Sequence, residues 1–169
     1  TEIDGEERQR LASFVANTGN LTSWNPRTDG EVRAIQEQGG IVYVGGAFEK
    51  VGEFGLYGSP LSESTGEVDL DFAVPNGTVQ AVVPDGSGGW YIGGTFTEVG
   101  GVSRNSLARL DATGNVTAWN PTPNGQVNDL LLKNGILYVV GAFTHIDNAA
   151  RARIAAFDAS TGNLTSWNP

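Results

Sequence analysis

The sequence predicts an all-β fold made of four-stranded antiparallel sheets that recur about every 48 residues. A tryptophan-containing segment appears as RQRLASFVANTGNLTSWNP (8–26), RNSLARLDATGNVTAWNP (104–121) and RARIAAFDASTGNLTSWNP (151–169). A second marker, IVYVGGAF (41–48), GWYIGGTF (89–96) and ILYVVGAF (136–143), places its phenylalanines 48 and 47 residues apart. The turns DGEV (29–32), NGTV (76–79) and NGQV (124–127) keep the same spacing. Three markers with one period indicate a repeat architecture.

Each unit holds four short strand-like runs separated by turn residues. The first run is VRAI (32–35), VQAVV (79–83) or VNDLLL (127–132), and a glycine turn leads into the second, VYVGGAF-type run. A ten-residue loop such as TEVGGVSRNS (97–106) precedes the third run, which is LASFV (11–15), SPLS (59–62), LARLD (107–111) or IAAFD (154–158). A TGN or TGE hairpin leads to the fourth run, LTSW, VDLDF, VTAW or LTSW. Helical periodicity is missing, so we expect almost no helix.

The second run decides the architecture. Ile41 and Tyr43 point to one side of the expected strand and Val42 and Val44 to the other, so both faces are apolar. A sheet with one wet face would alternate apolar and polar residues instead. Sheets stacked face to face satisfy this pattern, which predicts β-propeller blades. A β-sandwich is the competing all-β arrangement, but it gives no reason for a repeat of this length.

The markers divide the 169 residues into a half blade (1–26) and three full blades (27–72, 73–121 and 122–169). This organisation gives about three and a half blades, whereas propellers typically have about four to eight. We therefore expect the segment to be part of a larger propeller or to associate with copies of itself. An open stack is the third alternative, and it would expose apolar blade faces.

The order of motifs YVGGAF, LARLD and TAWNP resembles a kelch-like blade. Together with the arginine between them, the motifs are similar to the delta-60 type propeller repeat of bacterial secreted and surface proteins. The resemblance covers the whole chain and implies a propeller fold and an extracellular or cell-surface location. The second copy departs from the pattern, with Leu56 in place of the arginine, Ser59 in place of Leu or Ile, and Ala73-Val74 in place of Asn-Pro.

Composition excludes several function classes. The chain has 10 Lys and Arg against 19 Asp and Glu, and this net charge of −9 disfavours nucleic-acid binding. No apolar run approaches about 18 residues, so no membrane insertion is expected. There is no cysteine and a single histidine, His145, so the sequence offers no thiolate metal site, no cysteine nucleophile and no recognisable catalytic group. We therefore expect a protein that is not an enzyme and has no cofactor.

Four aromatic residues occupy the same place in successive units: Trp24, Phe72, Trp119 and Trp167. An enzyme needs one site, whereas four equivalent rings need a periodic cause. We expect each ring to wedge between neighbouring blades. The alternative is a repeated platform on which sugar rings stack.

Charged residues also recur. Arg8, Arg104 and Arg151 precede the third strand, and Asp111 and Asp158 close it. Repeated opposite charges predict an Arg–carboxylate clamp within or between blades. The sharper alternative is Ca²⁺ binding by the DATGN and DASTGN turns, but Ca²⁺ takes about six to eight oxygen ligands and one turn supplies too few.

The loop EKVGEFGLYGSP (49–60) is the best candidate for an interaction site. Phe54, Leu56 and Tyr57 are apolar where the other units read GEERQR, GVSRNS and NAARAR. They either bury against a neighbouring element or form an exposed contact patch. The function that fits best is a non-catalytic extracellular scaffold whose partners are proteins, either further blades of the same polypeptide or copies of itself. The alternatives are a carbohydrate-binding module with a glycan partner, and an accessory domain of a larger extracellular enzyme.

Overall fold

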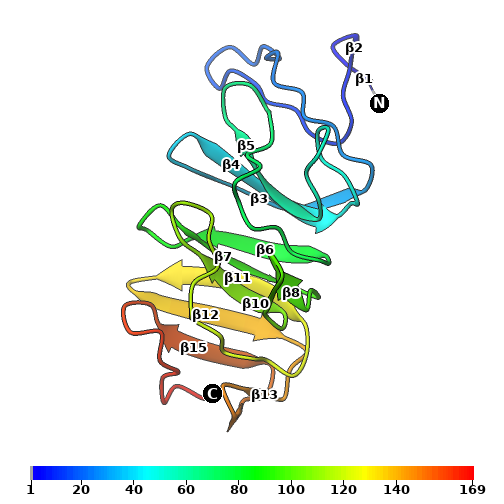
Figure 1. Ribbon diagram of the computed structural model, residues 1–169. Helices are drawn as coiled ribbons and strands as arrows, with labels where there is room; N and C mark the ends of the chain where they lie inside the picture. The colour runs from blue at the N-terminus through cyan, green and yellow to red at the C-terminus, as the bar shows by residue number, and fades with distance from the viewer. Residues whose placement is uncertain (1) are drawn as a thin grey trace.

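The computed structural model describes residues 2–169, and this part of the chain contains strands and no helix. Three antiparallel sheets follow one another along the molecule, and the two ends of the chain lie at opposite ends of this succession (Figure 1). The predicted all-β fold of propeller blades is confirmed. Within residues 2–169 there is accordingly no helix with the length and hydropathy needed to cross a membrane.

Each sheet pairs its strands in the order in which they occur. The first sheet contains β3 (Glu31–Gln38), β4 (Ile41–Ala47) and β5 (Gly58–Ser62). The second contains β6 (Val79–Pro84), β7 (Trp90–Gly94) and β10 (Leu107–Leu110). The third contains β11 (Val127–Lys133), β12 (Ile136–Gly141) and β15 (Ile154–Asp158).

Small hairpins occupy the loops that precede the third strands. They are β1 (Glu2–Ile3) with β2 (Glu6–Glu7), β8 (Glu98–Val99) with β9 (Val102–Ser103), and β13 (His145–Ile146) with β14 (Ala149–Ala150). The sequence predicted plain loops here.

The expected fourth strands are shorter than predicted. Each is a single antiparallel bridge to the third strand, formed by the pairs Leu61–Val68, Leu110–Val116 and Phe157–Leu164. In the half blade the third strand shrinks as well, to the bridge Phe14–Leu21. The physical reason is that an outermost strand has a neighbour on one side only. The unit with Ala73-Val74 in place of Asn-Pro has an equally short fourth strand, so the proline is not what limits its length.

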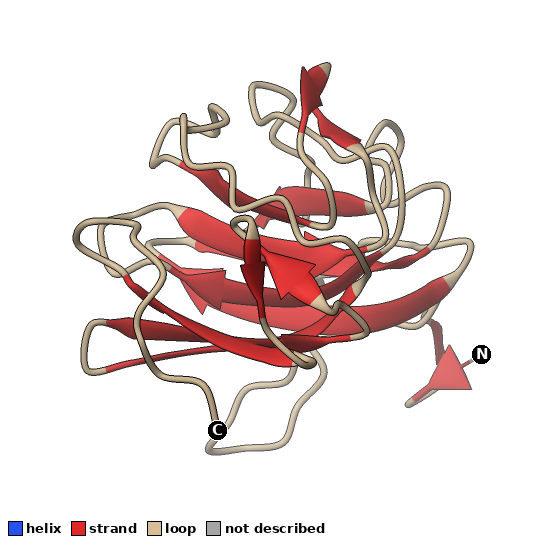
Figure 2. Ribbon diagram, turned by 90° about the horizontal axis from the view of Figure 1, so that it is seen from below, coloured by secondary structure: helices blue, strands red, loops and turns tan. Residues whose placement is uncertain are grey.

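The middle strands are buried on both faces, as the apolar pattern predicted. In β4 the residues Val42 to Gly46 are buried, and β7 is buried throughout. Neighbouring sheets contact each other mainly through their first strands, β3 against β6 and β6 against β11. Figure 2 shows the strands overlapping in the centre with loops projecting around them.

The first glycine of each doublet makes room for the next sheet. A Cβ at Gly45 would lie 2.5 Å from Cγ1 of Val79, and a Cβ at Gly93 would lie 2.5 Å from Cγ1 of Val127. The third sheet has Val140 at the equivalent position, on a face that no further sheet of this chain covers. In the first two sheets the glycine therefore leaves the space that the valine of the following sheet fills.

The second glycine of the doublet has a different cause. A Cβ at Gly46 would strike the carbonyl oxygen of Glu31, and a Cβ at Gly94 would strike that of Thr78, each in or beside the first strand of its own sheet. Gly141 keeps this glycine in the third sheet. The sequence predicted a close backbone approach for the doublets, and here the approach is within the sheet.

Candidate interaction site

The loops at one edge of the sheets are anchored by a turn side chain in each unit. One oxygen of Asp29, Asn76 or Asn124 accepts hydrogen bonds from two consecutive backbone N–H groups at the start of the following loop. Oδ1 of Asp29 lies 2.9 Å from the backbone nitrogen of Lys50, and this hydrogen bond lowers the pKa of Asp29. The sequence marked these turns as part of the repeat, but their role in holding the loop was not predicted.

The divergent loop carries exposed apolar side chains. Val51 and Gly55 exchange two backbone hydrogen bonds of 2.9 Å each, and Val51 is fully buried. The tight loop between them carries Phe54, whose exposed fraction is 62%. Leu56 is also exposed, and Tyr57 is half-buried. Of the two alternatives drawn from the sequence, the exposed patch describes Phe54 and Leu56.

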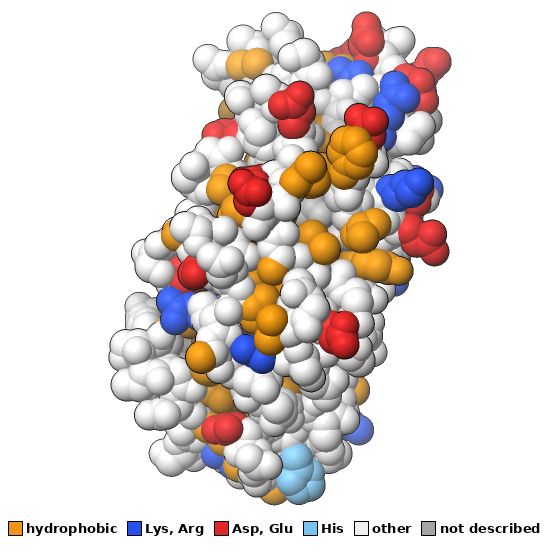
Figure 3. Space-filling view, in the orientation of Figure 1, with side chains coloured by type: hydrophobic (Ala, Val, Ile, Leu, Met, Phe, Trp, Pro, Cys, Tyr) orange, Lys and Arg blue, Asp and Glu red, His pale blue; other side chains and the backbone are white. Residues whose placement is uncertain are grey.

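A groove of about 630 Å³ runs beside Phe54. Its apolar wall includes Phe54, Val68 and Leu70, and Leu70 is 66% exposed. Its polar groups come from Asn25, Arg27, Glu53, Thr65 and Glu67. We call Phe54, Leu70 and the groove between them the Phe54–Leu70 surface. Figure 3 shows one face of the molecule, on which hydrophobic side chains gather over the first two sheets among acidic and basic groups.

The repeated aromatic rings lie between units. Each of the first three packs against a turn glycine of the following unit, in the pairs Trp24–Gly66, Phe72–Gly114 and Trp119–Gly162. Nε1 of Trp24 donates to the carbonyl oxygen of Ser62 at 3.0 Å, and Nε1 of Trp119 donates to that of Gly162 at 2.9 Å. No further unit follows Trp167 within the 169 residues, and this ring is 41% exposed.

The repeated arginines do not pair with Asp111 and Asp158, so the predicted clamp is wrong. Arg8, Arg104 and Arg151 each donate to two backbone carbonyls. Arg104, which is buried, donates to the oxygen of Ser103 at 2.7 Å and to that of Thr117. The guanidinium thereby ties the small hairpin to the fourth-strand segment, whose carbonyls have no ladder partner on their outer side. This fork geometry suits carbonyl oxygens as well as carboxylates.

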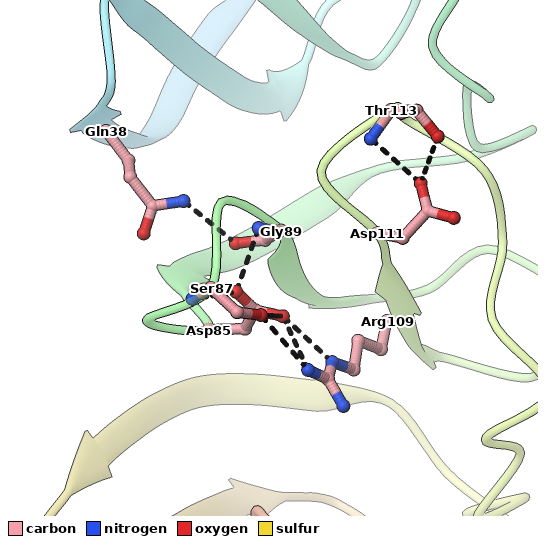
Figure 4. Close-up of polar contacts among 7 residues, drawn as sticks. All are labelled: Gln38, Asp85, Ser87, Gly89, Arg109, Asp111 and Thr113. Carbon is pink, nitrogen blue, oxygen red and sulfur yellow. Dashed lines mark hydrogen bonds and ion pairs between the residues drawn. The ribbon is translucent and has the colours of Figure 1, made fainter.

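Asp111 and Asp158 instead close their own turns. Oδ1 of Asp111 accepts from the Oγ1 and N–H of Thr113 and from the N–H of Asn115, as Figure 4 shows for Thr113. The hydroxyl of Thr113 is the main cause that lowers the pKa of Asp111, and the hydroxyl of Ser160 does the same for the pKa of Asp158. Within residues 2–169, no three His, Cys, Asp or Glu side chains gather in a way that could hold a metal ion.

The sequence did not predict the charged cluster around Asp85. Asp85, at the start of the β6–β7 turn, accepts from Nη2 of Arg109 at 2.7 Å and from the N–H and hydroxyl of Ser87 (Figure 4). Burial raises the pKa of Asp85, but these hydrogen bonds outweigh it and leave the pKa below its ordinary value. Gln38 of the preceding sheet donates to the oxygen of Gly89 in the same turn. Only the DGSGG turn sequence hinted at this cluster, because Arg109 has no counterpart in the other units.

The repeated sheets and their periodic loops define a β-propeller repeat domain. Residues 84–116 match a family described as a domain of unknown function (DUF5122) beta-propeller. The crystal structure of the computationally designed Ika8 protein is similar at 16% identity and a TM-score of 0.52, and the match covers 88% of this chain and 52% of that one. This chain therefore spans about half the length of that structure, and the likeness supports the fold alone. No curated protein sequence matches the chain.

Proposed function

We propose that this chain is a non-catalytic β-propeller scaffold of a secreted or cell-surface bacterial protein, of the kelch-like, delta-60 repeat type. It binds a protein partner through the Phe54–Leu70 surface. The observation that carries the proposal is Phe54, a large aromatic side chain held out by a loop that the scaffold anchors on both sides. Binding residues are often placed on loops that a rigid scaffold positions, and large exposed aromatics are typical anchors of protein interfaces.

Comparison between units strengthens the case. The position of Phe54 is occupied by Glu6, Val102 and Ala149 in the other units, so the repeat itself does not require an aromatic ring there. Leu70 faces the same groove and is equally exposed. Two exposed apolar side chains beside one groove offer a partner an anchor that desolvates on binding.

A carbohydrate-binding module is the second candidate. The same groove brings Asn25, Arg27 and Glu67 to the neighbourhood of an exposed aromatic ring. Hydrogen-bonding side chains beside such a ring suit a sugar, which offers hydroxyl groups at its edge and an apolar face. The scaffold function and the glycan function thus use one surface and differ in the ligand.

A phage-displayed random peptide library and a glycan array, probed with the same protein, separate the two candidates. We expect peptides rich in apolar residues to bind the wild-type chain at least about tenfold more tightly than the Phe54→Ser variant, because an interface anchor is worth about 2 kcal/mol. Val102→Ser, the same change at the equivalent position of the next unit, is the matched control and should bind like the wild type. Glycan binding that Phe54→Ser abolishes would replace the proposal by the second candidate. A surface that retains neither peptides nor glycans would refute both.

A further inference from the structure

The unit formed by residues 27–72 lacks the arginine that the other units place before their third strands. Leu56 stands at this position, and its side chain is 40% exposed, whereas Arg104 at the equivalent position of the next unit is buried. A leucine has no polar hydrogen to donate, so it cannot tie the loop to the fourth-strand segment as Arg104 does. Part of a unit precedes residues 27–72 and a full unit follows them, so the difference lies within the succession of units.

The oxygen that the missing arginine would bind is the carbonyl oxygen of Asp69. The N–H of Asp69 donates to the oxygen of Pro60 at 3.0 Å, as the N–H of Thr117 donates to that of Arg109 at 2.9 Å. Asp69 is therefore the equivalent of Thr117, whose own oxygen accepts from Arg104. Pro60 lies opposite Asp69 and, as a proline, has no N–H to offer. Within residues 2–169 no other backbone N–H donates to this oxygen.

Asp69 lies beside the Phe54–Leu70 surface. Leu70 is the next residue along the chain, and Leu56 belongs to the same loop as Phe54. A Cβ at Gly52 would lie 3.1 Å from Cγ2 of Val68, so this loop and the fourth-strand segment are in contact. The other units have a small residue at the position of Leu70, namely Ser23, Ala118 and Ser166. The loss of the arginine and the gain of two large apolar side chains thus occur together in one unit.

Charge around this surface is mainly negative. The acidic residues that line the groove or flank Leu70 are Glu53, Glu67, Asp69 and Asp71. Arg27 is the basic residue among those that line the groove, and its guanidinium lies 3.7 Å from a carboxylate oxygen of Glu7. Acidic groups around an apolar groove are complementary to a partner that offers a cation together with an apolar side chain.

We propose that the Phe54–Leu70 surface binds a protein segment that carries an arginine next to an apolar side chain. The apolar side chain packs against Phe54 and Leu70. The guanidinium donates to the carbonyl oxygen and the carboxylate of Asp69, in the place that the arginine of the repeat takes in the other units. Arginine suits this place better than lysine, because its planar fork binds two acceptors at once. This inference rests on the proposed function, since it names the chemistry of the partner for the same surface.

Two peptide arrays of random sequence test the proposal. They are identical except that one has an arginine and the other a glutamine at the central position of every peptide. We expect the wild-type chain to bind the arginine array. Its best peptide should bind about tenfold more tightly than the same peptide with glutamine, because hydrogen bonds with a charged partner are the stronger ones. This preference for arginine should shrink at high salt, which screens exposed charges.

Leu56→Arg is the decisive variant. It restores the residue of the repeat, whose guanidinium would bind the oxygen of Asp69 from within the chain, and the preference for arginine should fall to about twofold or less. Val102→Arg adds the same charge at an exposed position of the next unit and should keep the wild-type preference. Asp69→Thr, again the residue of the other units, removes the carboxylate and should lower the preference about threefold.

The outcomes separate this inference from the proposed function. Equal binding to both arrays, lost in Phe54→Ser, would overturn the inference and leave the proposed function in place. A preference for arginine that persists in both Leu56→Arg and Asp69→Thr would also overturn it. So would a preference that Val102→Arg removes as well, because net charge alone would then explain the binding. A chain that binds neither array would refute both.

Discussion

Gly45→Ala tests the central packing argument, that the first glycine of a doublet exists to admit the next sheet. The added Cβ would lie 2.5 Å from Cγ1 and 2.8 Å from Cβ of Val79, whereas carbon atoms pack at about 3.5–4.0 Å. The gap must therefore open by about 1 Å at two atoms. Val79 is β-branched and sits fully buried on a strand, so it has few rotamers with which to yield.

We expect this change to cost the upper part of the about 1–3 kcal/mol range observed for overpacked cores. Val79→Ala alone removes two methyl groups and should cost about 1.6 kcal/mol, at about 0.8 kcal/mol for each. The double variant should be more stable than the sum of the two changes by about 1–2 kcal/mol, because the Cγ1 clash is gone. The rescue is partial since the contact between the two Cβ atoms remains.

Equilibrium urea unfolding of the wild type, both single variants and the double variant gives this coupling energy. Val140→Ala is the control at the equivalent position of the third sheet, where no valine arrives from a following sheet, and it should cost less than about 1 kcal/mol. A Gly45→Ala protein within about 0.5 kcal/mol of the wild type, or a cycle without coupling, would refute the reasoning.

Three further changes probe the contacts between and within units. Arg104→Lys should lower the free energy of unfolding by about 2–4 kcal/mol in urea, because one ammonium group cannot reach both carbonyls that the guanidinium binds; an unchanged midpoint would show that these bonds contribute nothing. Trp119→Ala should cost about 3–5 kcal/mol, whereas Trp167→Ala should cost less than about 1 kcal/mol, and equal losses would contradict the wedge interpretation. The lowered pKa of Asp85 means that its carboxylate stabilises the fold above its unfolded pKa of about 3.9, and this contribution is lost as pH falls through the folded pKa. Asp85→Asn should therefore be less stable than the wild type at pH 7 and lose less stability on acidification, as urea midpoints from about pH 6 to 2.5 would show; parallel pH curves for the two proteins would argue against it.

Much of the fold follows from patterns that are local in the sequence. The period of about 48 residues and the two apolar faces of β4 predict stacked sheets, because a strand covered on both sides needs a neighbour on each. Turn residues also predict where the hairpins lie, because glycine and asparagine adopt a positive φ more easily than other residues. The length of the fourth strands was overestimated. Their apolar residues indicate burial against a partner strand, but they do not show how many backbone hydrogen bonds the two strands form.

The candidate site depends on contacts between residues that lie far apart in the sequence. Arg104 was paired with Asp111 on charge alone, whereas a guanidinium binds whichever acceptors lie within reach, and the nearest are carbonyls of the fourth-strand segment. The exposure of Phe54 could not be derived either, because an apolar residue in a loop turns inward or outward according to the space that distant segments leave for it.

The sequence by itself determined that this protein is a succession of equivalent antiparallel sheets, since period and strand pattern are properties of neighbouring residues. Only the tertiary structure decided which of those residues meet. Gly45 admits Val79, and Trp119 covers Gly162. Such contacts depend on how whole sheets are placed against one another, which is a balance of packing over many residues rather than a preference of any one.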